Sequence, residues 1–433
     1  MIQTKDNSIT TAISEGQELD DLRRMARPSI AELCSDEESS LLVFPKSLDE
    51  YGDRIGTEHI FAINGENQLV TGNIMGFVGY NDTQVSIRSR FAQQEGDYFL
   101  HYMLQKVFAI NLFDLKHDSD NESVFDFLIY LFPTFLKRAL RQGLYKEYQT
   151  RHYNDANVRG RIDIQRHIRQ NIPFAGKVAY TTREYAVDNS VTQLVRHTIE
   201  YIASHPYRGN ILNNDEETKE AVSLINNATP SYNGNDRNRI INLNKKPINH
   251  PYFNEYRDLQ RLCIRILRHE EMKYGKEEKR IYGILFDGAW LWEEYLSTIL
   301  KNIGFEHPQN KSGKGRKYLF SDHAGVCYPD FYSGDMVLDA KYKGYEDLGK
   351  VQTADLYQVI SYMHILKLNH GGFVVPVSTS NQSIAKMLNG FGGRMSVFGM
   401  QVDQQCLTFN DFVARMETEE LRLQESIRGF VSC

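Results

Sequence analysis

The chain has 433 residues, of which 41% are hydrophobic and 24% are charged, and its formal net charge is −6. This length predicts two or three globular domains, and the negative charge excludes a protein that coats nucleic acid over its whole surface, so that any nucleic-acid-binding surface must be local. No apolar run is long enough to span a bilayer, which excludes a membrane role, and the five scattered cysteines, with no CxxC pair, favour reduced thiols in a cytoplasmic protein over structural zinc.

The first quarter of the chain combines a polar segment with a small β module. Residues 1–40 are polar and weakly patterned, and we expect part of this segment to be disordered. Residues 41–95 are expected to form the β module, in which Asn64-Gly65 predicts one hairpin turn and the alternation of 76–87 predicts a second hairpin. No pattern in this module indicates chemistry, so its role stays open.

Residues 96–250 are expected to form a middle region of helices and strands. The helical pattern between 97 and 144 contains Pro133, which should kink or divide its second helix. Further along we expect strands at 157–164 and 177–182 and a helix from about 188 to 203.

Positive charge is concentrated in this middle region. From Lys137 to Arg183 there are eleven Lys and Arg residues against three Asp and Glu residues, a local excess of eight positive charges. Such an excess either neutralises the phosphates of double-stranded DNA or forms an ordinary solvated face, and both readings stay open. The candidate DNA-binding residues are Arg159, Arg161, Arg166 and Arg169.

Residues 251–433 alternate helices with strands, which predicts a mixed sheet flanked by helices. The expected helices are 252–270, 289–301, 353–367 and 409–426; the expected strands carry Asp330 and Asp339 or cover 372–377 and 395–402. The whole chain is therefore expected to be an α/β protein, a mixed α+β multidomain chain.

Two carboxylates and one ammonium are predicted to meet in this last region. Asp330, in Pro329-Asp330, stands a short loop ahead of the strand-like run that ends in Asp339-Ala340-Lys341. Residues two apart in a strand point to the same side, so Asp339 and Lys341 should be neighbours. Carboxylate oxygens suit Mg²⁺, or Mn²⁺ as its substitute, and a nearby lysine suits the orientation of a water. Two carboxylates and a lysine in this arrangement are suited to the metal-dependent hydrolysis of a phosphodiester.

Context distinguishes this triplet from chance, because an acidic residue two positions before a lysine occurs five times in the chain. Only Asp339 has an upstream Pro-Asp, strand-like flanks and a following helix. The helix before it offers Glu293 to the same site, with Glu294 as the alternative carboxylate. The helix after it places Gln358 among apolar residues, where an amide needs a partner such as the lysine or a water.

Together these residues resemble the PD-(D/E)xK nuclease superfamily. A narrower resemblance is to the McrC family, and it covers most of the chain from about residue 97. It is carried by five segments in order: Val158-Arg-Gly-Arg-Ile-Asp163, Ala186-Val-Asp-Asn-Ser-Val-Thr-Gln-Leu-Val-Arg196, Leu291-Trp-Glu-Glu-Tyr-Leu296, Asp339-Ala-Lys-Tyr-Lys343 and Asp355-Leu-Tyr-Gln-Val-Ile-Ser-Tyr362.

The resemblance implies the function of a Mg²⁺-dependent endonuclease subunit in a modification-dependent (5-methylcytosine-type) restriction system. It implies a partner, an McrB-like AAA+ GTPase that this subunit stimulates, and a C-terminal PD-(D/E)xK domain. It also implies that Asp330 and Asp339 bind the metal, that Lys341 orients the attacking water, and that Glu293 and Gln358 support them.

No nucleotide is expected to be bound by this chain itself. Gly344 to Val351 has the spacing of a phosphate-binding loop, but valine stands where Ser or Thr must hold Mg²⁺. Two alternative functions stay open: a non-catalytic activator of a GTPase ring, and a stand-alone repair or mobile-element nuclease.

Overall fold

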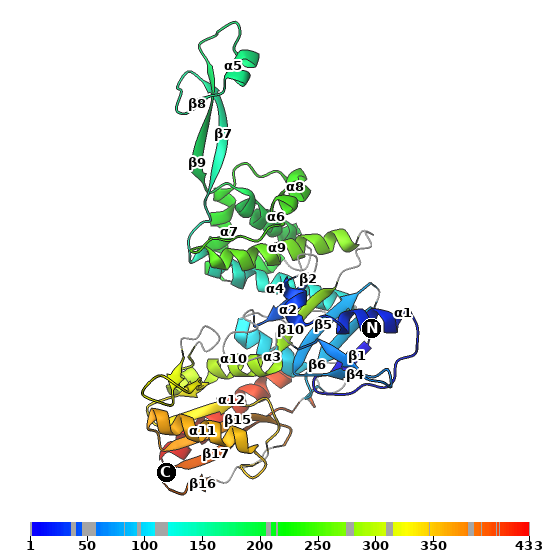
Figure 1. Cartoon of the computed structure of the whole chain (residues 1–433), viewed down its shortest axis with the longest axis vertical. Helices are drawn as coiled ribbons and strands as arrows, with labels where there is room; N and C mark the ends of the chain where they lie inside the picture. The colour runs from blue at the N-terminus through cyan, green and yellow to red at the C-terminus, as the bar shows by residue number, and fades with distance from the viewer. Residues whose placement is uncertain are drawn as a thin grey trace. The chain divides into compact units, whose positions relative to one another are not determined.

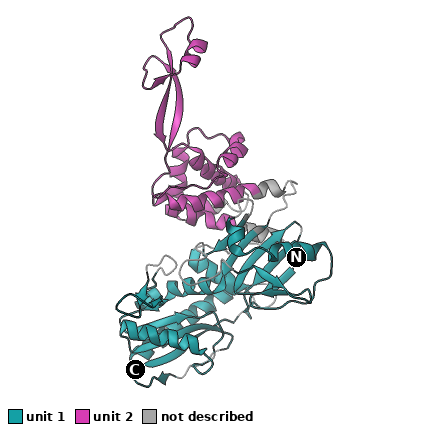
Figure 2. Ribbon diagram, viewed as in Figure 1, with its two compact units in different colours: residues 1–110, 278–433 teal, residues 111–277 magenta. Residues whose placement is uncertain are grey.

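In the computed structural model the chain forms two compact units (Figure 2): residues 1–110 with 278–433, and residues 111–277. It describes residues 2–35, 40–45, 58–92 except 82, 97–108, 120–204, 209–273 except 214, 281–308, 315–403 except 346, 380–384 and 391, and 405–432 except 407. The expected domains were continuous, whereas the first unit joins both ends of the chain.

The N-terminal part of the first unit is built on a sheet in the order β1-β6-β5-β10-β2. Its elements are β1 (Ile2–Lys5), α1 (Gln17–Ala26), α2 (Ile30–Ser35), β2 (Ser40–Phe44), β3 (Phe61–Ile63), β4 (Leu69–Thr71), β5 (Ile74–Tyr80), β6 (Thr83–Arg88), α3 (Tyr98–Phe108) and β10 (Tyr282–Asp287). Strand β10 enters between β5 and β2 from the far side of the sequence. Gly76 and Gly283 allow this pairing, since a Cβ on either would meet a carbonyl oxygen of the other strand at 2.2 Å.

Both predicted hairpins are present: β3 pairs with β4, and β5 with β6, each antiparallel. The expectation of a weakly ordered segment before residue 40 is wrong for the described residues 2–35. They supply β1 and two helices, and Leu22 and Met25 of α1 are fully buried in the core of this sheet. The apolar residues of α1 recur at helical spacing within a polar sequence, which makes the helix amphipathic.

The C-terminal part of the first unit contains a second sheet in the order β13-β14-β15-β17-β16. Its elements are α10 (Gly288–Leu300), η5 (Lys301–Ile303), β11 (Lys317–Tyr318), β12 (Val326–Cys327), β13 (Phe331–Tyr332), β14 (Met336–Ala340), α11 (Thr353–Leu366), β15 (His370–Val377), β16 (Lys386–Met387), β17 (Arg394–Gln401) and α12 (Phe409–Ser432). The inner pairs β14–β15 and β15–β17 are parallel and the outer pairs antiparallel, which confirms a mixed sheet.

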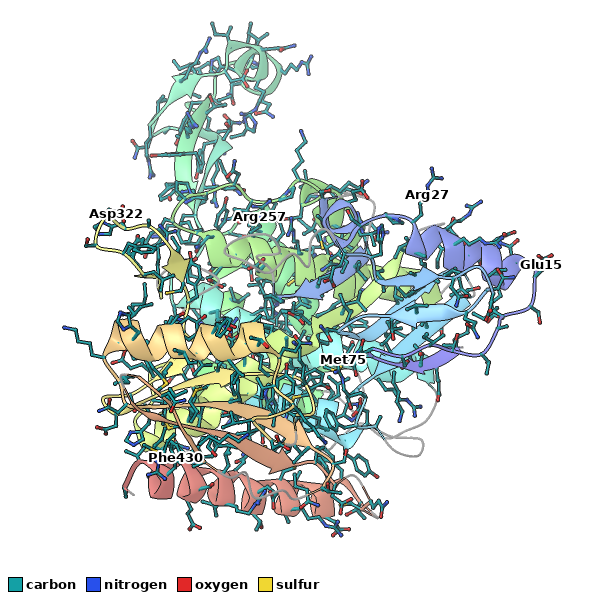
Figure 3. All side chains as sticks on the ribbon, turned by 60° about the horizontal axis from the view of Figure 1, so that its bottom comes forward. Glu15, Arg27, Met75, Arg257, Asp322 and Phe430 are labelled. Carbon is teal, nitrogen blue, oxygen red and sulfur yellow. The ribbon has the colours of Figure 1, made fainter. Side chains whose placement is uncertain are left out.

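Helices cover both faces of this second sheet. On β17, Val397 belongs to the core shared with α11, while the neighbouring Phe398 packs against Phe430 of α12. Because successive strand residues face opposite sides, α11 and α12 lie on opposite faces. Figure 3 shows α12, which carries Phe430, along one side of the sheet and α11 along the other. The mixed α/β class expected from the sequence is confirmed.

The second unit consists of helices and a projecting hairpin (Figure 1). Its elements are α4 (Asp120–Leu140), β7 (Glu147–Asp155), β8 (Arg161–Ile162), α5 (Ile164–Gln170), β9 (Val178–Ala186), α6 (Ser190–Ser204), η3 (Gly209–Asn213), α7 (Glu216–Ala228), η4 (Gly234–Asp236), α8 (Arg237–Leu243) and α9 (Asn254–Lys273). Pro133 lies inside α4 and does not divide it. Helix α9, expected with the C-terminal domain, belongs to this unit and packs against α4 and α6.

The projecting part of the second unit, here called the arm, comprises residues 147–186. In it β9 pairs along its length with β7 and at its far end with β8 (Figure 1). The strand expected at 157–164 is shorter than predicted, because Asp163 caps helix α5 by accepting a hydrogen bond from the N–H of Arg166. Among the described residues, no helix is long and apolar enough to cross a membrane.

Candidate active site

The predicted acidic pair lies at the end of β14. Asp339 is 1% exposed and lies between the buried Leu338 and the partly exposed Ala340 in a strand flanked by β13 and β15. Lys341 lies just beyond the strand, but its N–H still donates to the carbonyl of Val374 on β15 at 3.1 Å. The pairing therefore continues for one more residue, and the side chains of Asp339 and Lys341 lie on the same side.

Asp330 is brought to the same place by the hairpin between β13 and β14. Its Oδ2 accepts a hydrogen bond from the N–H of Ala340 at 2.8 Å, which fixes the carboxylate beside the end of β14. The carbonyl oxygen of Asp330 accepts a hydrogen bond from Nδ1 of His307 at 2.9 Å, and the His307 ring stacks on Phe331. The sequence spacing of Pro-Asp to Asp-x-Lys thus places two carboxylates at one point.

Three side-chain oxygens surround the Lys341 ammonium. Nζ lies 2.9 Å from Oδ2 of Asp339 and 3.4 Å from Oδ1 of Asp355, and donates to Oε1 of Gln358 at 3.1 Å. Burial alone would lower the pKa of Lys341, but the charges of Asp339 and Asp330 raise it above its ordinary value. Lys341 is therefore an ammonium, suited to orientation and charge stabilisation rather than to accepting a proton.

Gln358 links this ammonium to the segment before Asp330. Its Nε2 donates to the hydroxyl of Tyr362 at 2.7 Å, and that hydroxyl donates to the carbonyl of Tyr328 at 3.1 Å. The amide in an apolar stretch of sequence has the lysine as its partner, as its position suggested. Helix α11 thereby fixes both the Lys341 ammonium and the main chain at Tyr328, two residues before Asp330.

Glu293 on α10 faces the acidic pair. Burial and then the charge of Asp330 raise its pKa well above the ordinary value, with Glu294 and Asp339 adding to the same effect. Glu293 and Glu294 both lie near His307, with a carboxylate oxygen of each 3.9 Å from its Nε2. Burial lowers the pKa of His307, but the contact with Glu294 and the Asp330 carbonyl raise it above its ordinary value. The charges of both Asp330 and Asp339 therefore act on the Glu293 carboxyl.

Two residues of this cluster were missed from the sequence, Asp355 and His307. Asp355 binds Lys341, and also accepts a hydrogen bond from the hydroxyl of Tyr345 at 2.5 Å. Asp355 stands three residues before Gln358 on α11, and residues at that spacing share a helix face, so the pair could have been found. His307 gave no signal, because it follows a loop and contacts Asp330 through the main chain.

The acidic pair fits a divalent cation. Asp339 is buried, and its Oδ1 has no hydrogen-bond partner among the described residues. Among the residues that the structure describes, no three His, Cys, Asp or Glu side chains are grouped in a metal-binding arrangement. Mg²⁺ usually keeps several waters and takes one or two carboxylates together with substrate oxygens. Asp330 and Asp339 match that donor set.

Cation binding at this pair is expected to depend on pH. Burial and the charge of Asp330 raise the pKa of Asp339 to about 7, although Lys341 opposes the shift. A metal ion must displace this proton, so the affinity for Mn²⁺ should fall by about tenfold for each pH unit below 7. Titrating Mn²⁺ into the protein by calorimetry between about pH 5.5 and 8 measures this, and equal affinity throughout would contradict it.

The four candidate DNA-binding arginines all lie on the arm, far along the sequence from the acidic pair. Arg159, Arg161 and Arg169 are exposed. Arg166 is half-buried, donates to the carbonyl of Tyr153 at 3.2 Å and lies 3.8 Å from Asp163, so it holds the arm together. The same tip exposes apolar side chains: Val158, Ile162, Ile164, Ile168, Ile172 and Phe174. This combination of cations and bare apolar surface is typical of a contact surface.

The chain is similar to proteins of one known family. Residues 69–376 match the family of McrBC 5-methylcytosine restriction system components, a range that contains every residue of the acidic site. No curated protein matches the chain. A solved chain from an assembly of Thermococcus gammatolerans McrB AAA+ hexamers with bound McrC is similar, with 16% identity, a TM-score of 0.54, and coverage of 99% of this chain and 100% of that chain.

A second solved structure, the Thermococcus gammatolerans McrBC complex determined by cryo-EM, has 14% identity and a TM-score of 0.34 over 71% of this chain and 90% of that chain. Of the two structures, the first is similar in fold over nearly the whole length of the chain.

Proposed function

Because the chain belongs to the family of McrBC 5-methylcytosine restriction system components, we propose that it is the DNA-cutting subunit of such a system. The observation that carries this proposal is the buried Asp339 carboxylate, paired at 2.9 Å with Lys341 and adjoining Asp330 at the end of one strand. The activity is Mg²⁺-dependent endonuclease cleavage of double-stranded DNA. The second sheet with α10 and α11 is then a PD-(D/E)xK nuclease domain, the superfamily that the sequence resembles.

In this proposal each side chain has a separate task. Asp330 and Asp339 hold Mg²⁺, which lowers the pKa of a bound water and offsets charge on the phosphate. Lys341 orients the attacking water and stabilises negative charge as it develops, and its ammonium needs no change of protonation to do so. Gln358 fixes Lys341, and Glu293 supports the metal side of the site.

The partner in this proposal is an McrB-like AAA+ GTPase that recognises 5-methylcytosine-type modification and whose GTP hydrolysis this chain stimulates. The similar solved chain comes from an assembly of McrB AAA+ hexamers with bound McrC, which supports the choice of partner. The second unit supplies the docking surface, since the arm presents exposed apolar side chains that a monomeric protein rarely leaves in water.

The arm arginines are proposed to contact DNA phosphates. Replacing Arg159, Arg161 and Arg169 together by Gln should lower DNA affinity at low salt by about tenfold. The slope of log K against log salt should become shallower by about 2 to 3, because each phosphate contact contributes nearly one unit to that slope. Fluorescence anisotropy at several salt concentrations measures both quantities. The control is Arg141→Gln, an exposed arginine of the same unit outside the arm. Unchanged affinity with lost stimulation of the partner's GTPase would assign these arginines to the motor instead.

The proposed function is tested by incubating methylated and unmethylated plasmid with the chain and Mg²⁺, with and without the AAA+ partner and GTP. Cleavage that requires methylation, partner and GTP is the expected result. Cleavage by the chain alone would favour a stand-alone repair or mobile-element nuclease. No cleavage, with faster GTP hydrolysis by the partner, would show a non-catalytic activator.

A further inference from the structure

Arg90 follows strand β6 in the N-terminal part of the first unit, and its guanidinium reaches the segment directly after Lys341. Nη1 donates to the carbonyl oxygen of Tyr342 at 3.2 Å. The guanidinium also lies over the Tyr342 ring, with Cζ 4.6 Å from the ring centroid. Since Tyr342 is the next residue after Lys341, this contact fixes the main chain beside the ammonium.

The same guanidinium reaches the start of the helix that carries Glu293. Nη2 of Arg90 donates to Oδ1 of Asn73 at 2.9 Å, and the carbonyl of Asn73 accepts a hydrogen bond at 2.7 Å from the N–H of Gly288, the first residue of α10. The Tyr342 ring closes against this glycine, because a Cβ on Gly288 would lie 3.0 Å from both the ring and the Asn73 oxygen. One arginine thus links the two chain segments that bring side chains to the acidic pair.

Arg90 is itself held by Asp6, whose side chain is completely buried. Nε donates to Oδ2 of Asp6 at 2.8 Å, and Nη2 and the main-chain N–H of Arg90 also donate to this carboxylate. A buried ion pair contributes little net stability compared with apolar residues of the same volume. The ion pair with Asp6 instead has a geometric role: it directs the planar guanidinium at two fixed acceptors, the Tyr342 carbonyl and Oδ1 of Asn73.

We propose that Arg90 is a positioning residue for the cleavage site, fixing Lys341 and the start of α10 relative to each other. The inference rests on the proposed function of that site. It assigns a role to the N-terminal β module, whose sequence shows no chemistry of its own: through Arg90 the module supports the nuclease site. Strand β10, which belongs to the module's sheet and leads directly into α10, is the covalent part of the same support.

The test is Arg90→Gln in the full-length chain, assayed with the AAA+ partner, GTP and Mg²⁺. Displacing reacting groups by about 1 Å costs on the order of 100-fold, so kcat for DNA cleavage should fall by about 10- to 100-fold. KM for DNA and the partner's GTP turnover should change by less than about threefold, because Arg90 contacts neither in this proposal. Arg90→Lys keeps a charge for Asp6 but lacks the fork, so its kcat should be intermediate and its thermal stability nearer to wild type.

Arg24→Gln is the matched control. Arg24 lies on α1, which packs against β5 and β6 of the same sheet. It donates to the hydroxyl of Tyr80 at 2.9 Å, with Cζ 5.7 Å from that ring, but Tyr80 is the last residue of β5, at the opposite end from Asn73. This variant should keep the wild-type kcat. Equal losses of kcat in the Arg24 and Arg90 variants would show that the loss comes from a general decrease in stability, and would overturn the inference.

Hydrogen exchange measured by mass spectrometry provides a readout that needs no cleavage. Peptides covering 338–345 and 286–294 should exchange faster in Arg90→Gln and at the wild-type rate in Arg24→Gln. Unchanged exchange and unchanged kcat in both Arg90 variants would overturn the inference. If the wild-type chain cuts no DNA but these two peptides still exchange faster in Arg90→Gln, the proposed function fails, whereas the positioning role of Arg90 stands.

Discussion

Asp339→Asn is expected to lower the rate of DNA cleavage by at least about 10³-fold, because the neutral amide is a poor ligand for Mg²⁺ and the metal supplies several kcal/mol of charge stabilisation. The substitution preserves the shape of a side chain that is 1% exposed. Lys341 keeps its contacts with Asp355 and Gln358 in this variant, so the fold should not be greatly weakened. The measurement is single-turnover cleavage of methylated DNA with partner, GTP and Mg²⁺.

Asp335→Asn is the control for this prediction. Asp335 is an exposed carboxylate in the turn between β13 and β14, four residues from Asp339, and its removal should leave the rate unchanged. DNA binding in Ca²⁺ and stimulation of the partner's GTPase should be normal in both variants. An Asp339→Asn protein that binds DNA and cuts it at the wild-type rate would show that this pair of carboxylates is not the cleavage site.

Lys341→Met is expected to lower the cleavage rate by about 10²- to 10³-fold, the loss typical when one positioned charge-stabilising group is removed from a transition state. Methionine has a similar reach but no charge. The pKa of Asp339 should rise further, since Lys341 lowers it. The positive charge that repels Mg²⁺ from these carboxylates is lost as well, so at a pH above that pKa half-maximal cleavage should require no more Mg²⁺ than in the wild type. Cleavage rates at several Mg²⁺ concentrations separate these two effects.

Lys343→Met is the matched control, because Lys343 contacts the same Asp355 at 3.4 Å but is exposed and does not contact Asp339. This variant should retain most of its activity. Equal losses in the two lysine variants would point to the balance of charge around Asp355. Such a result would contradict a specific role for the Lys341 ammonium.

The central part of the candidate site could be predicted from the sequence because it depends on local geometry. Asp339 and Lys341 are two residues apart in one strand, and a short hairpin returns Asp330 to them, so spacing alone brings the three together. Gln358 was predicted from its apolar surroundings, and its hydrogen bond to Lys341 confirms that it has a polar partner there. The metal and the reaction themselves stay predictions, whereas the resemblance to McrC is confirmed by the family match.

Contacts between distant parts of the chain could not be predicted in this way. Strand β10 joins a sheet formed by residues more than two hundred positions earlier, such as Gly79 and Ser40, which both pair with Tyr282. Its apolar sequence is compatible with any sheet. For the same reason the chain was divided into continuous domains, and the link from Arg90 to Tyr342 had no local signal. Residues 2–35 were underestimated because their apolar positions are few, although several of them, such as Leu22, Met25 and Ile30, are fully buried in the core of this sheet.

The position of a bound metal ion is the measurement that tests this account most directly. Crystals of the chain with DNA and Mn²⁺ at about pH 8, above the pKa of Asp339, should give an anomalous peak within about 2.2 Å of a carboxylate oxygen of both Asp339 and Asp330, with Lys341 beside it and a phosphate oxygen completing the ligands. A Mn²⁺ ion bound elsewhere along the DNA, with the Asp339 carboxylate still paired only with Lys341, would contradict the assignment of this cluster as the cleavage site.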